Sequence, residues 1–256
     1  MSVVPPGAGD KALLDELFVA EMNATMNVDP HVHLEHVDSF FVLDGEFTFE
    51  RVGEEAVLGP GTYALAPPRL VHGFRPGNSR VLNVHAPGRY WARREAARRE
   101  GLDSSAYDSH DPPPDGGLPR SDAVIVPPRE GELLETDDRR LRILAARPEL
   151  CVFLFDADAG YVGPSAHVHR QHTDGFYVLE GELAFELDGE DVAAPAGTWV
   201  AATPGMRHTF RNARDEPVTF LNIHAPGMRF DKYLRRLDGG EDGRELHESF
   251  DVYEQG

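Results

Sequence analysis

The sequence predicts an all-β protein made of two tandem domains, each a small barrel or sandwich with a short helix after it. One observation is a histidine string that occurs twice, as HVHLEHVDSFFVLDGE over residues 31–46 and as HVHRQHTDGFYVLEGE over residues 167–182. Another is the many short runs of β-branched and aromatic residues separated by glycine turns, which are typical of antiparallel β-structure. The chain of 256 residues is long enough for one large domain or two domains of about 120 residues, and the repeat favours two.

The repeat keeps one offset at five polar positions. Four residues of the first string reappear 136 positions later in the second string, and a fifth, His72, reappears as His208. Histidine is scarce, at 12 of 256 residues, so this agreement indicates a tandem duplication. The matching pairs within the strings are His31 and His167, His33 and His169, His36 and His172, and Asp38 and Asp174.

The predicted elements follow the same order in both halves. After each string, FFVLDGEFTFE and FYVLEGELAFELDGE predict hairpins, GTYALAP and GTWVAAT predict a further strand, and LNVHAPG and LNIHAPG end a late strand. Helix-forming segments follow at residues 90–100 and 228–237. Residues 102–122 are dense in Pro, Gly, Ser and Asp, which predicts a linker. We therefore expect one domain at 1–101 and the other at 123–256.

The two halves differ at their starts. AVIVP at 123–127, RLRILAA at 140–146 and LCVFLF at 150–155 predict strands before the second string, whereas only 30 residues precede His31. One interpretation is that the first half lacks an initial strand that the second half supplies. The single cysteine, Cys151, alternates with phenylalanines in its predicted strand, and we expect it to be buried.

The charge balance disfavours several classes of partner. The chain has 44 acidic and 25 basic residues, a formal net charge of −19. Nucleic acids and anionic membranes are bound by clustered cations, so neither is expected as a partner. No apolar run approaches the roughly 18 residues that a membrane span requires, and the N-terminus lacks the basic start and apolar stretch of a signal peptide. We expect a cytoplasmic protein.

Each half places candidate metal ligands close together. Residues i and i+2 of a strand share a face, so the two histidines of each HVH segment project together. Three imidazoles and one carboxylate suit Fe, Mn, Ni, Co or Cu with open positions for substrate or dioxygen, and suit Mg or Ca poorly. Zn is a further candidate in purified material, and we expect one ion per domain. The predicted ligands are His31, His33, Asp38 and His72 in the first half and His167, His169, Asp174 and His208 in the second.

The same residues match both sequence motifs of the cupin superfamily. The first motif has the form HxH, four residues, an acid, six residues and Gly, and it occurs at 31–45 and 167–181. The second has the form Gly, five residues, Pro, x, Gly, two residues, His, three residues and Asn. It occurs with departures, because Thr203 replaces Pro in the second half, and Arg69 and Pro76 replace Gly and Asn in the first. The chain therefore resembles a bicupin.

The resemblance implies two antiparallel jelly-roll barrels with a metal inside each. Among bicupins the chain is most similar to the quercetin 2,3-dioxygenase type, also described as pirin-like, through its FYVLEGELAFELDG hairpin and the LNIHAPG strand followed by a helix. The acidic ligand of the family is usually Glu, which in quercetinase-like enzymes is also a general base towards the substrate hydroxyl. Asp in both halves is one methylene shorter, which puts this role in question.

Two further histidine pairs are candidates for a supporting role. We expect His36 and His172 to lie beside the ligands or at the surface, and not to be a fifth ligand. His85 and His224 follow an asparagine by two residues on the late strand, where an inward imidazole could orient a ligand or move a proton. A strand-end histidine bonded to the backbone is an equal alternative. The candidate catalytic residues are Asp174 and His224.

Three functions remain open at this point. The leading hypothesis is a metal-dependent dioxygenase, hence an oxidoreductase, that acts on a small aromatic or enolic substrate whose ionised oxygen binds the metal. The alternatives are a non-oxidative isomerase, lyase or decarboxylase, and a protein that binds a small molecule without turnover. We expect the second half to be the catalytic one, because it keeps Gly205 and Asn212 of the second motif. The expected partners are a small-molecule substrate and O2, and a homodimer stays open.

Overall fold

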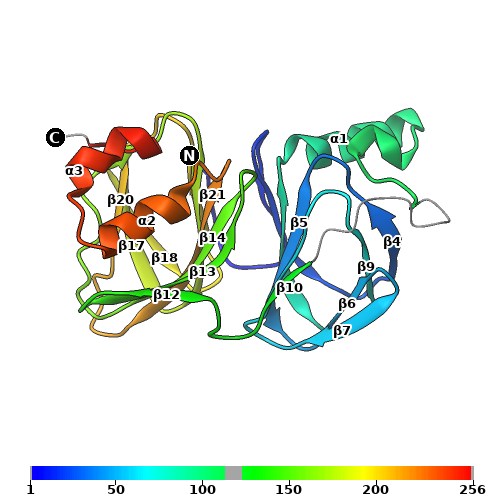
Figure 1. The fold of residues 1–256 in the computed structure, drawn as a ribbon, viewed down its shortest axis with the longest axis horizontal. Coiled ribbons are helices and arrows are strands. Elements are labelled where there is room, and N and C mark those ends of the chain that lie inside the picture. The colour runs from blue at the N-terminus through cyan, green and yellow to red at the C-terminus, as the bar shows by residue number, and fades with distance from the viewer. Residues whose placement is uncertain (1, 113–122, 255–256) are drawn as a thin grey trace. The chain divides into compact units, whose positions relative to one another are not determined.

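The computed structural model describes residues 2–112 and 123–254 (Figure 1). Strands account for 48% of the structure and helices for 13%, which confirms the all-β prediction. The chain forms two compact units, one of Ala8–Glu130 and the other of Met1–Gly7 with Gly131–Gly256. Each histidine string therefore lies in its own unit.

The first unit is built from two antiparallel sheets around a phenylalanine core. The larger sheet has the strand order β11-β8-β5-β10-β3-β2, and the smaller has the order β4-β9-β6-β7. Phe40, Phe47, Phe49 and Phe74 lie in its core, where they fill the space between the sheets. The strands are β2 (Gly9–Leu13), β3 (Phe18–Asn23), β4 (Val28–Val32), β5 (Val37–Asp44), β6 (Phe47–Arg51), β7 (Glu54–Leu58), β8 (Tyr63–Ala66), β9 (Val71–Arg75), β10 (Arg80–Ala86) and β11 (Val124–Val126).

The second unit repeats this plan. Its larger sheet has the order β1-β19-β16-β21-β14-β13-β12, and its smaller sheet the order β18-β17-β20-β15-β22. Phe176, Phe185 and Phe210 lie in its core, and Cys151 is buried there as expected. The strands are β1 (Ser2–Val4), β12 (Glu132–Glu135), β13 (Arg139–Ala146), β14 (Cys151–Ala157), β15 (His167–Val168), β16 (Thr173–Glu180), β17 (Glu182–Leu187), β18 (Glu190–Pro195), β19 (Trp199–Ala202), β20 (His208–Arg211), β21 (Val218–Ala225) and β22 (Tyr253–Glu254).

One edge strand of each large sheet comes from the part of the sequence that was predicted to belong to the other domain. Strand β1 pairs with β19 of the second unit, and β11, the AVIVP segment, pairs with β8 of the first. A three-residue edge strand needs only backbone partners, so its composition does not tell which sheet it joins. The outer strand β12 has no counterpart in the described part of the first unit, in keeping with the shorter start of the first half.

The segment expected to be a linker is partly structured. Its first residues contain the 3-10 helix η1 (Ser104–Tyr107), which belongs to the first unit, whereas residues 113–122 lie outside the described residues. Ser and Asp do not fill a core, but their side chains cap turns and bond the backbone. Asp103 does so at the start of η1 by accepting from the N–H of Ser105. Composition alone therefore overestimated the linker.

A helix follows the late strand of each unit, as predicted. Helix α1 (Arg89–Glu100) follows β10, and α2 (Phe230–Asp238) follows β21. The second unit continues with α3 (Gly243–Leu246) and the 3-10 helix η2 (His247–Phe250). None of the helices in the described residues is both long enough and apolar enough to cross a membrane.

Candidate metal centres

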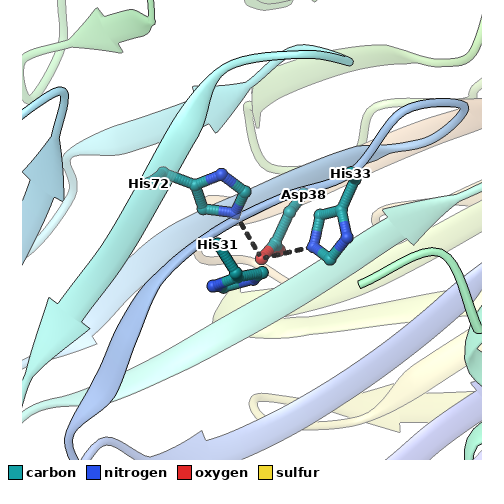
Figure 2. Close-up of side chains that lie close together, drawn as sticks. All are labelled: His31, His33, Asp38 and His72. Carbon is teal, nitrogen blue, oxygen red and sulfur yellow. Dashed lines mark hydrogen bonds and ion pairs between the residues drawn. The ribbon is translucent and has the colours of Figure 1, made fainter. Parts of the chain in front are cut away.

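The predicted ligands of the first half come together inside the first unit (Figure 2). His31 on β4 lies opposite His72 of β9, its cross-strand partner, and His33 follows β4 directly. Asp38 reaches the same point from β5 of the other sheet. One ligand atom from each of these four residues lies within 4.8 Å of the others, and Figure 2 shows two of the imidazoles directed at the carboxylate.

The second unit repeats the arrangement. His167 of β15 pairs with His208 of β20, His169 follows β15, and Asp174 arrives from β16. The Nε2 atoms of His208 and His169 lie 3.3 Å and 3.8 Å from Oδ2 of Asp174. The corresponding distances in the first unit are 3.3 Å and 3.9 Å. The duplication has therefore kept the geometry of the cluster as well as its residues.

Hydrogen bonds determine which nitrogen of each imidazole faces the cluster. Nδ1 of His31 and of His72 lies 3.0 Å from the main-chain carbonyl two residues earlier. Nδ1 of His33 lies 2.6 Å from the carbonyl of Asp108, 75 residues away. A carbonyl only accepts, so each Nδ1 carries the proton and each Nε2 presents its lone pair to the cluster. The matching bonds of the second unit join His167, His208 and His169 to the carbonyls of Ser165, Met206 and Asp251 at 2.8, 3.0 and 2.7 Å.

Both clusters fit a transition-metal ion. The Nε2 atoms of His33 and His169 are buried and have no hydrogen-bond partner among the described residues. A buried polar atom without a partner is unfavourable by roughly 1–3 kcal/mol. Three imidazole nitrogens and one carboxylate oxygen are donors that first-row transition metals prefer. An ion held between them would give each orphaned nitrogen its missing partner.

Burial keeps the candidate ligands in the forms that bind a metal. Burial, together with nearby imidazoles, lowers the pKa of His31 to about 4 and the pKa of His167 to about 3. Burial alone would raise the pKa of Asp38, but the imidazoles of His85 and His72 outweigh it and lower that pKa to about 2. Near pH 7 these imidazoles are therefore neutral and the carboxylate is ionised.

A chain of hydrogen bonds leads away from each carboxylate ligand, and we call it the histidine chain. In the second unit Asn222 donates to Oδ1 of Asp174 at 2.5 Å, and Oδ1 of Asn222 lies 2.9 Å from Nε2 of His224. Nδ1 of His224 lies 3.0 Å from Nε2 of His172, whose Nδ1 lies 2.8 Å from Oδ2 of Asp251. The first unit has the same chain through Asp38, Asn83, His85, His36 and Asp108, with steps of 2.6, 3.0, 3.1 and 2.7 Å.

The histidine chain has room for one more proton than its neutral imidazoles carry. Asn222 donates its amide protons to Asp174 and to a main-chain carbonyl, so its oxygen accepts from His224. The bonds from there through His172 to Asp251 need three protons, and two neutral imidazoles supply two. Burial lowers the pKa of both imidazoles. The additional proton would lie between Nδ1 of His224 and Nε2 of His172, and the lowered pKa values disfavour it near pH 7.

The structure assigns a place to each supporting histidine. His36 and His172 are buried in the histidine chains, and His85 and His224 face inward beside the carboxylate ligands. The structure therefore excludes a surface position for the first pair and a strand-end histidine bonded only to the backbone for the second pair. Their buried rings instead connect each carboxylate ligand to a second acid.

Neither of these second acids, Asp108 and Asp251, was predicted from the sequence. One lies in the segment assigned to the linker, and the other lies in the C-terminal segment, where the halves no longer align. Each directly follows an aromatic residue, Tyr107 or Phe250, at the end of a 3-10 helix. This aromatic–Asp pair after the helix of each half is the one signal that the sequence offers.

The departure at Arg69 leaves the turn beside the ligands intact. The N–H of Arg69 donates to the carbonyl of His33 at 2.6 Å, as the N–H of Gly205 donates to the carbonyl of His169. Both residues take a left-handed conformation, with φ of 73° for Arg69 and 86° for Gly205. The Arg69 side chain is exposed, so it reproduces the backbone of the motif without entering the cluster.

A cavity of about 120 Å³ adjoins the second cluster. The candidate ligands His167 and Asp174 line it, as does His224 of the histidine chain. Its apolar wall comes partly from α2, including Phe230 and Leu234. Its polar wall includes two tyrosines and a cation, namely Tyr161, Tyr233 and Arg139. A small molecule in this cavity would therefore meet both the ligand cluster and a guanidinium group.

Comparison with known proteins agrees with this geometry. A family model described as a cupin domain matches residues 19–84 and 153–224. Quercetin 2,3-dioxygenase of Bacillus subtilis (strain 168) is 25% identical over an alignment of 254 residues. The match covers 83% of this chain and 73% of that protein. Polyketide synthase CurC of Streptomyces cyaneus is 32% identical over 98 residues, 35% of this chain and 64% of that protein.

Solved structures add evidence on the fold. Oxalate decarboxylase from Bacillus subtilis, solved at pH 4.6, superposes with a TM-score of 0.55 over 88% of this chain and 76% of that one, at 15% identity. Another oxalate decarboxylase structure, concerned with an element that modulates proton-coupled electron transfer, gives a TM-score of 0.56 at 14% identity, over 88% and 77% of the two chains. At such identities the likeness shows a shared two-domain fold and no more.

Proposed function

The chain belongs to the cupin family, with one cupin domain in each half, and we propose that it is a metal-dependent dioxygenase acting on a small aromatic or enolic substrate. The observation that carries the metal dependence is the orphaned Nε2 of His33 and of His169, each aimed at three other candidate donors. The choice of dioxygenase is supported by the quercetin 2,3-dioxygenase relative, which matches most of this chain. Fe, Mn, Ni, Co and Cu all suit the donors.

The second unit supplies the residues for the proposed reaction. His167, His169, His208 and Asp174 would hold the ion, which would supply Lewis acidity and redox chemistry towards dioxygen. Oδ2 of Asp174 faces the ligand histidines, whereas Oδ1 is bonded by an asparagine and lies 3.5 Å from Nε2 of His224. A substrate hydroxyl in the cavity would lose its proton to Asp174, and His224, whose Nε2 donates to Asn222, would hold the asparagine that orients this carboxylate.

The cavity supports a compact, oxygen-rich substrate. Its volume of about 120 Å³ is below the roughly 300–1,000 Å³ of drug-sized pockets. Arg139 can neutralise an ionised oxygen or carboxylate, and the hydroxyls of Tyr161 and Tyr233 can bond it. Phe210 and Phe230 offer faces against which a planar ring can pack. These features favour a small enolate or phenolate.

The test is metal analysis followed by oxygen uptake. Purified protein reconstituted with each candidate metal is expected to hold close to two ions per chain, and to consume O2 with members of a panel of catechols, enols and flavonols. His208→Ala should remove one ion and serve as the matched control for activity. Metal content near zero in all reconstitutions would overturn the metal sites, and turnover without oxygen uptake would overturn the dioxygenase.

A second function is favoured by the buried carboxylate of Asp174. A buried proton acceptor beside a Lewis acid also serves an isomerase, lyase or decarboxylase, none of which consumes O2. Substrate loss under strictly anaerobic conditions would support this reading. A binding protein without turnover is the third candidate, and it would show ligand affinity with no product in either condition.

A further inference from the structure

We propose that Asp251 and Asp108 are positioning residues, each of which orients the second ligand histidine of one metal site and the histidine chain beside it. The inference rests on the proposed metal sites and concerns residues outside both family motifs. Neither aspartate is a ligand in the proposed set. Each acts through the residues it holds.

One residue, Asp251, makes several long-range bonds to this corner of the second site. The main-chain carbonyl of Asp251 accepts from Nδ1 of His169 at 2.7 Å. Its carboxylate lies 3.1 Å from the N–H of Arg170, 2.8 Å from the N–H of Gln171 and 2.8 Å from Nδ1 of His172. The carboxylate side chain is fully buried, at 0% exposure. Asp251 therefore fixes the candidate ligand His169, the turn after it and the last imidazole of the histidine chain, His172.

The second ligand depends on this contact more than the other ligands do. Nδ1 of His167 and Nδ1 of His208 each bond the main-chain carbonyl two residues earlier, so their partners are local in the sequence. His169 bonds instead to a carbonyl 82 residues away. Without it, the ring loses the acceptor that keeps the proton on Nδ1 and the lone pair on Nε2. The orientation of this one ligand is thus set from the C-terminal segment.

The backbone at both aspartates is consistent with this use. Asp108 and Asp251 end their 3-10 helices in the left-handed region, at φ of 58° and 61°. Glycine is the usual residue there, and another residue is less favourable by roughly 1 kcal/mol. Aspartate tolerates the region and adds a carboxylate, which is the group that the site uses.

The first unit reaches the same arrangement with a different segment. The carbonyl of Asp108 accepts from His33, and its carboxylate accepts from the N–H groups of Leu34 and Glu35 at 2.9 Å each and from His36 at 2.7 Å. The segments around the two aspartates share little sequence, and their offset of 143 differs from the 136 of the ligands. Identical contacts from diverged segments indicate that the contacts themselves are needed at each site.

The test measures metal binding at one site at a time. Full-length His72→Ala protein is the parent that retains the second site, and His208→Ala protein is the parent that retains the first. Asp251→Gly is added to each parent, because glycine keeps the left-handed turn and the carbonyl and removes only the carboxylate. Co²⁺ affinity is measured by competition with a chelator, and the visible d–d spectrum reports the ligand geometry.

We expect Asp251→Gly to weaken Co²⁺ binding at the second site by about 10–100-fold and to alter its spectrum. Asp251→Asn, which keeps one acceptor oxygen, should fall between this variant and the parent. Asp108→Gly should have the same effect on the first site alone. Glu248→Ala, which removes an exposed carboxylate from the same 3-10 helix, is the matched control and should leave affinity and spectrum unchanged.

Two results would overturn the assignment. One is a folded Asp251→Gly protein whose Co²⁺ affinity and spectrum equal those of its parent. The other is an Asp251→Gly effect of equal size at both sites, since a positioning contact acts only on its own unit. A wild-type chain that takes up no Co²⁺ would instead overturn the metal sites and this inference together, so the two failures are distinguishable.

Discussion

The carboxylate ligand shows how one residue can be shortened without losing its place in the cluster. Asp38 and Asp174 stand where the family motif usually has Glu, yet Oδ2 of each lies 3.3 Å from a ligand imidazole. The other oxygen is held by an asparagine of the neighbouring strand, at 2.6 Å from Asn83 and 2.5 Å from Asn222. Because one oxygen is occupied in this way, the side chain presents a single oxygen to an ion.

Arg69 allows a stability prediction at the level of one residue. Its φ of 73° is strained for a residue with a Cβ, and its side chain is exposed. Arg69→Gly should therefore raise the free energy of unfolding by about 1 kcal/mol. Urea denaturation followed by circular dichroism would measure the change.

The equivalent turn of the second unit supplies the control. Gly205 has a φ of 86° and no atom within 4 Å of an added Cβ, so Gly205→Ala should be destabilising by a similar amount through strain alone. An unchanged or lower stability of Arg69→Gly would mean that the Arg69 side chain makes a stabilising contact that outweighs its backbone strain.

The ligand histidines predict how the metal-free protein responds to acid. The pKa of His31 is about 4 and that of His167 about 3 in the folded chain, against about 6.5 when unfolded. Between these values the unfolded chain binds more protons, so the free energy of unfolding falls as the pH falls from 6.5 towards 4, and the contribution is complete above 6.5. Thermal unfolding of the metal-free protein from pH 8 to pH 4 should show this decline.

A variant with the two imidazoles removed tests the cause of that decline. His31→Gln with His167→Gln should flatten the dependence of Tm on pH between 6.5 and 4. Added Ni²⁺ should raise the Tm of the wild type in the same range, because it binds the folded chain with neutral imidazoles. A decline of equal slope in the double variant would place its origin in other groups.

At the scale of elements, each late helix covers the histidine chain with an aromatic ring. Trp91 of α1 stacks on His85 with 4.3 Å between ring centroids, and Phe230 of α2 stacks on His224 at 3.7 Å. The helix therefore does more than close the barrel, because its ring excludes water from one imidazole of the chain.

Phe230→Ala is expected to lower both the free energy of unfolding and the affinity of the second site for Co²⁺. Truncation of this buried ring should lower the free energy of unfolding by about 3–5 kcal/mol and let water reach His224. Leu246→Ala, in the buried face of α3 and outside the cavity lining, should lower stability by about 2–5 kcal/mol while leaving Co²⁺ binding at the second site unchanged. Equal effects of the two variants on Co²⁺ binding would contradict a specific role of the ring.

For the whole molecule, the features that could be predicted from the sequence are those that depend on local periodicity. The HVH spacing, the hairpins and the helix after each late strand depend on neighbouring residues, and the structure has the two cupin domains that these patterns indicated. Edge strands β1 and β11 were assigned to the wrong side of the boundary, since backbone pairing carries little sequence information. Asp108 and Asp251 were missed because they reach the sites from 75 and 82 residues away.

The duplicated chain leads to a prediction about division of labour between its halves. Both units hold the same four candidate ligands and the same histidine chain, so ligation alone predicts equal metal occupancy. The differences lie around the sites. Asn212 bonds the carbonyls of Asp158 and Glu216 in the second unit, whereas proline stands at the matching position 76. Strand β13 brings Arg139 to the cavity, whereas the cation of β2, the strand in the matching place of the first unit, is Lys11, which is buried in an ion pair with Glu21.

We therefore expect the second site to carry the turnover and the first to hold a metal without it. His208→Ala should abolish activity, and His72→Ala should keep most of it, each with one metal ion retained per chain. Arg139→Met should raise KM for an anionic substrate at least about tenfold with a smaller change in kcat, because the lost cation binds ground state and transition state alike. Oxygen uptake with the identified substrate, together with metal analysis of each variant, measures all three. If His72→Ala abolishes turnover and His208→Ala spares it, with the untouched site still loaded in each, the catalytic site is the first one. The cavity beside Arg139 would then serve binding and not chemistry.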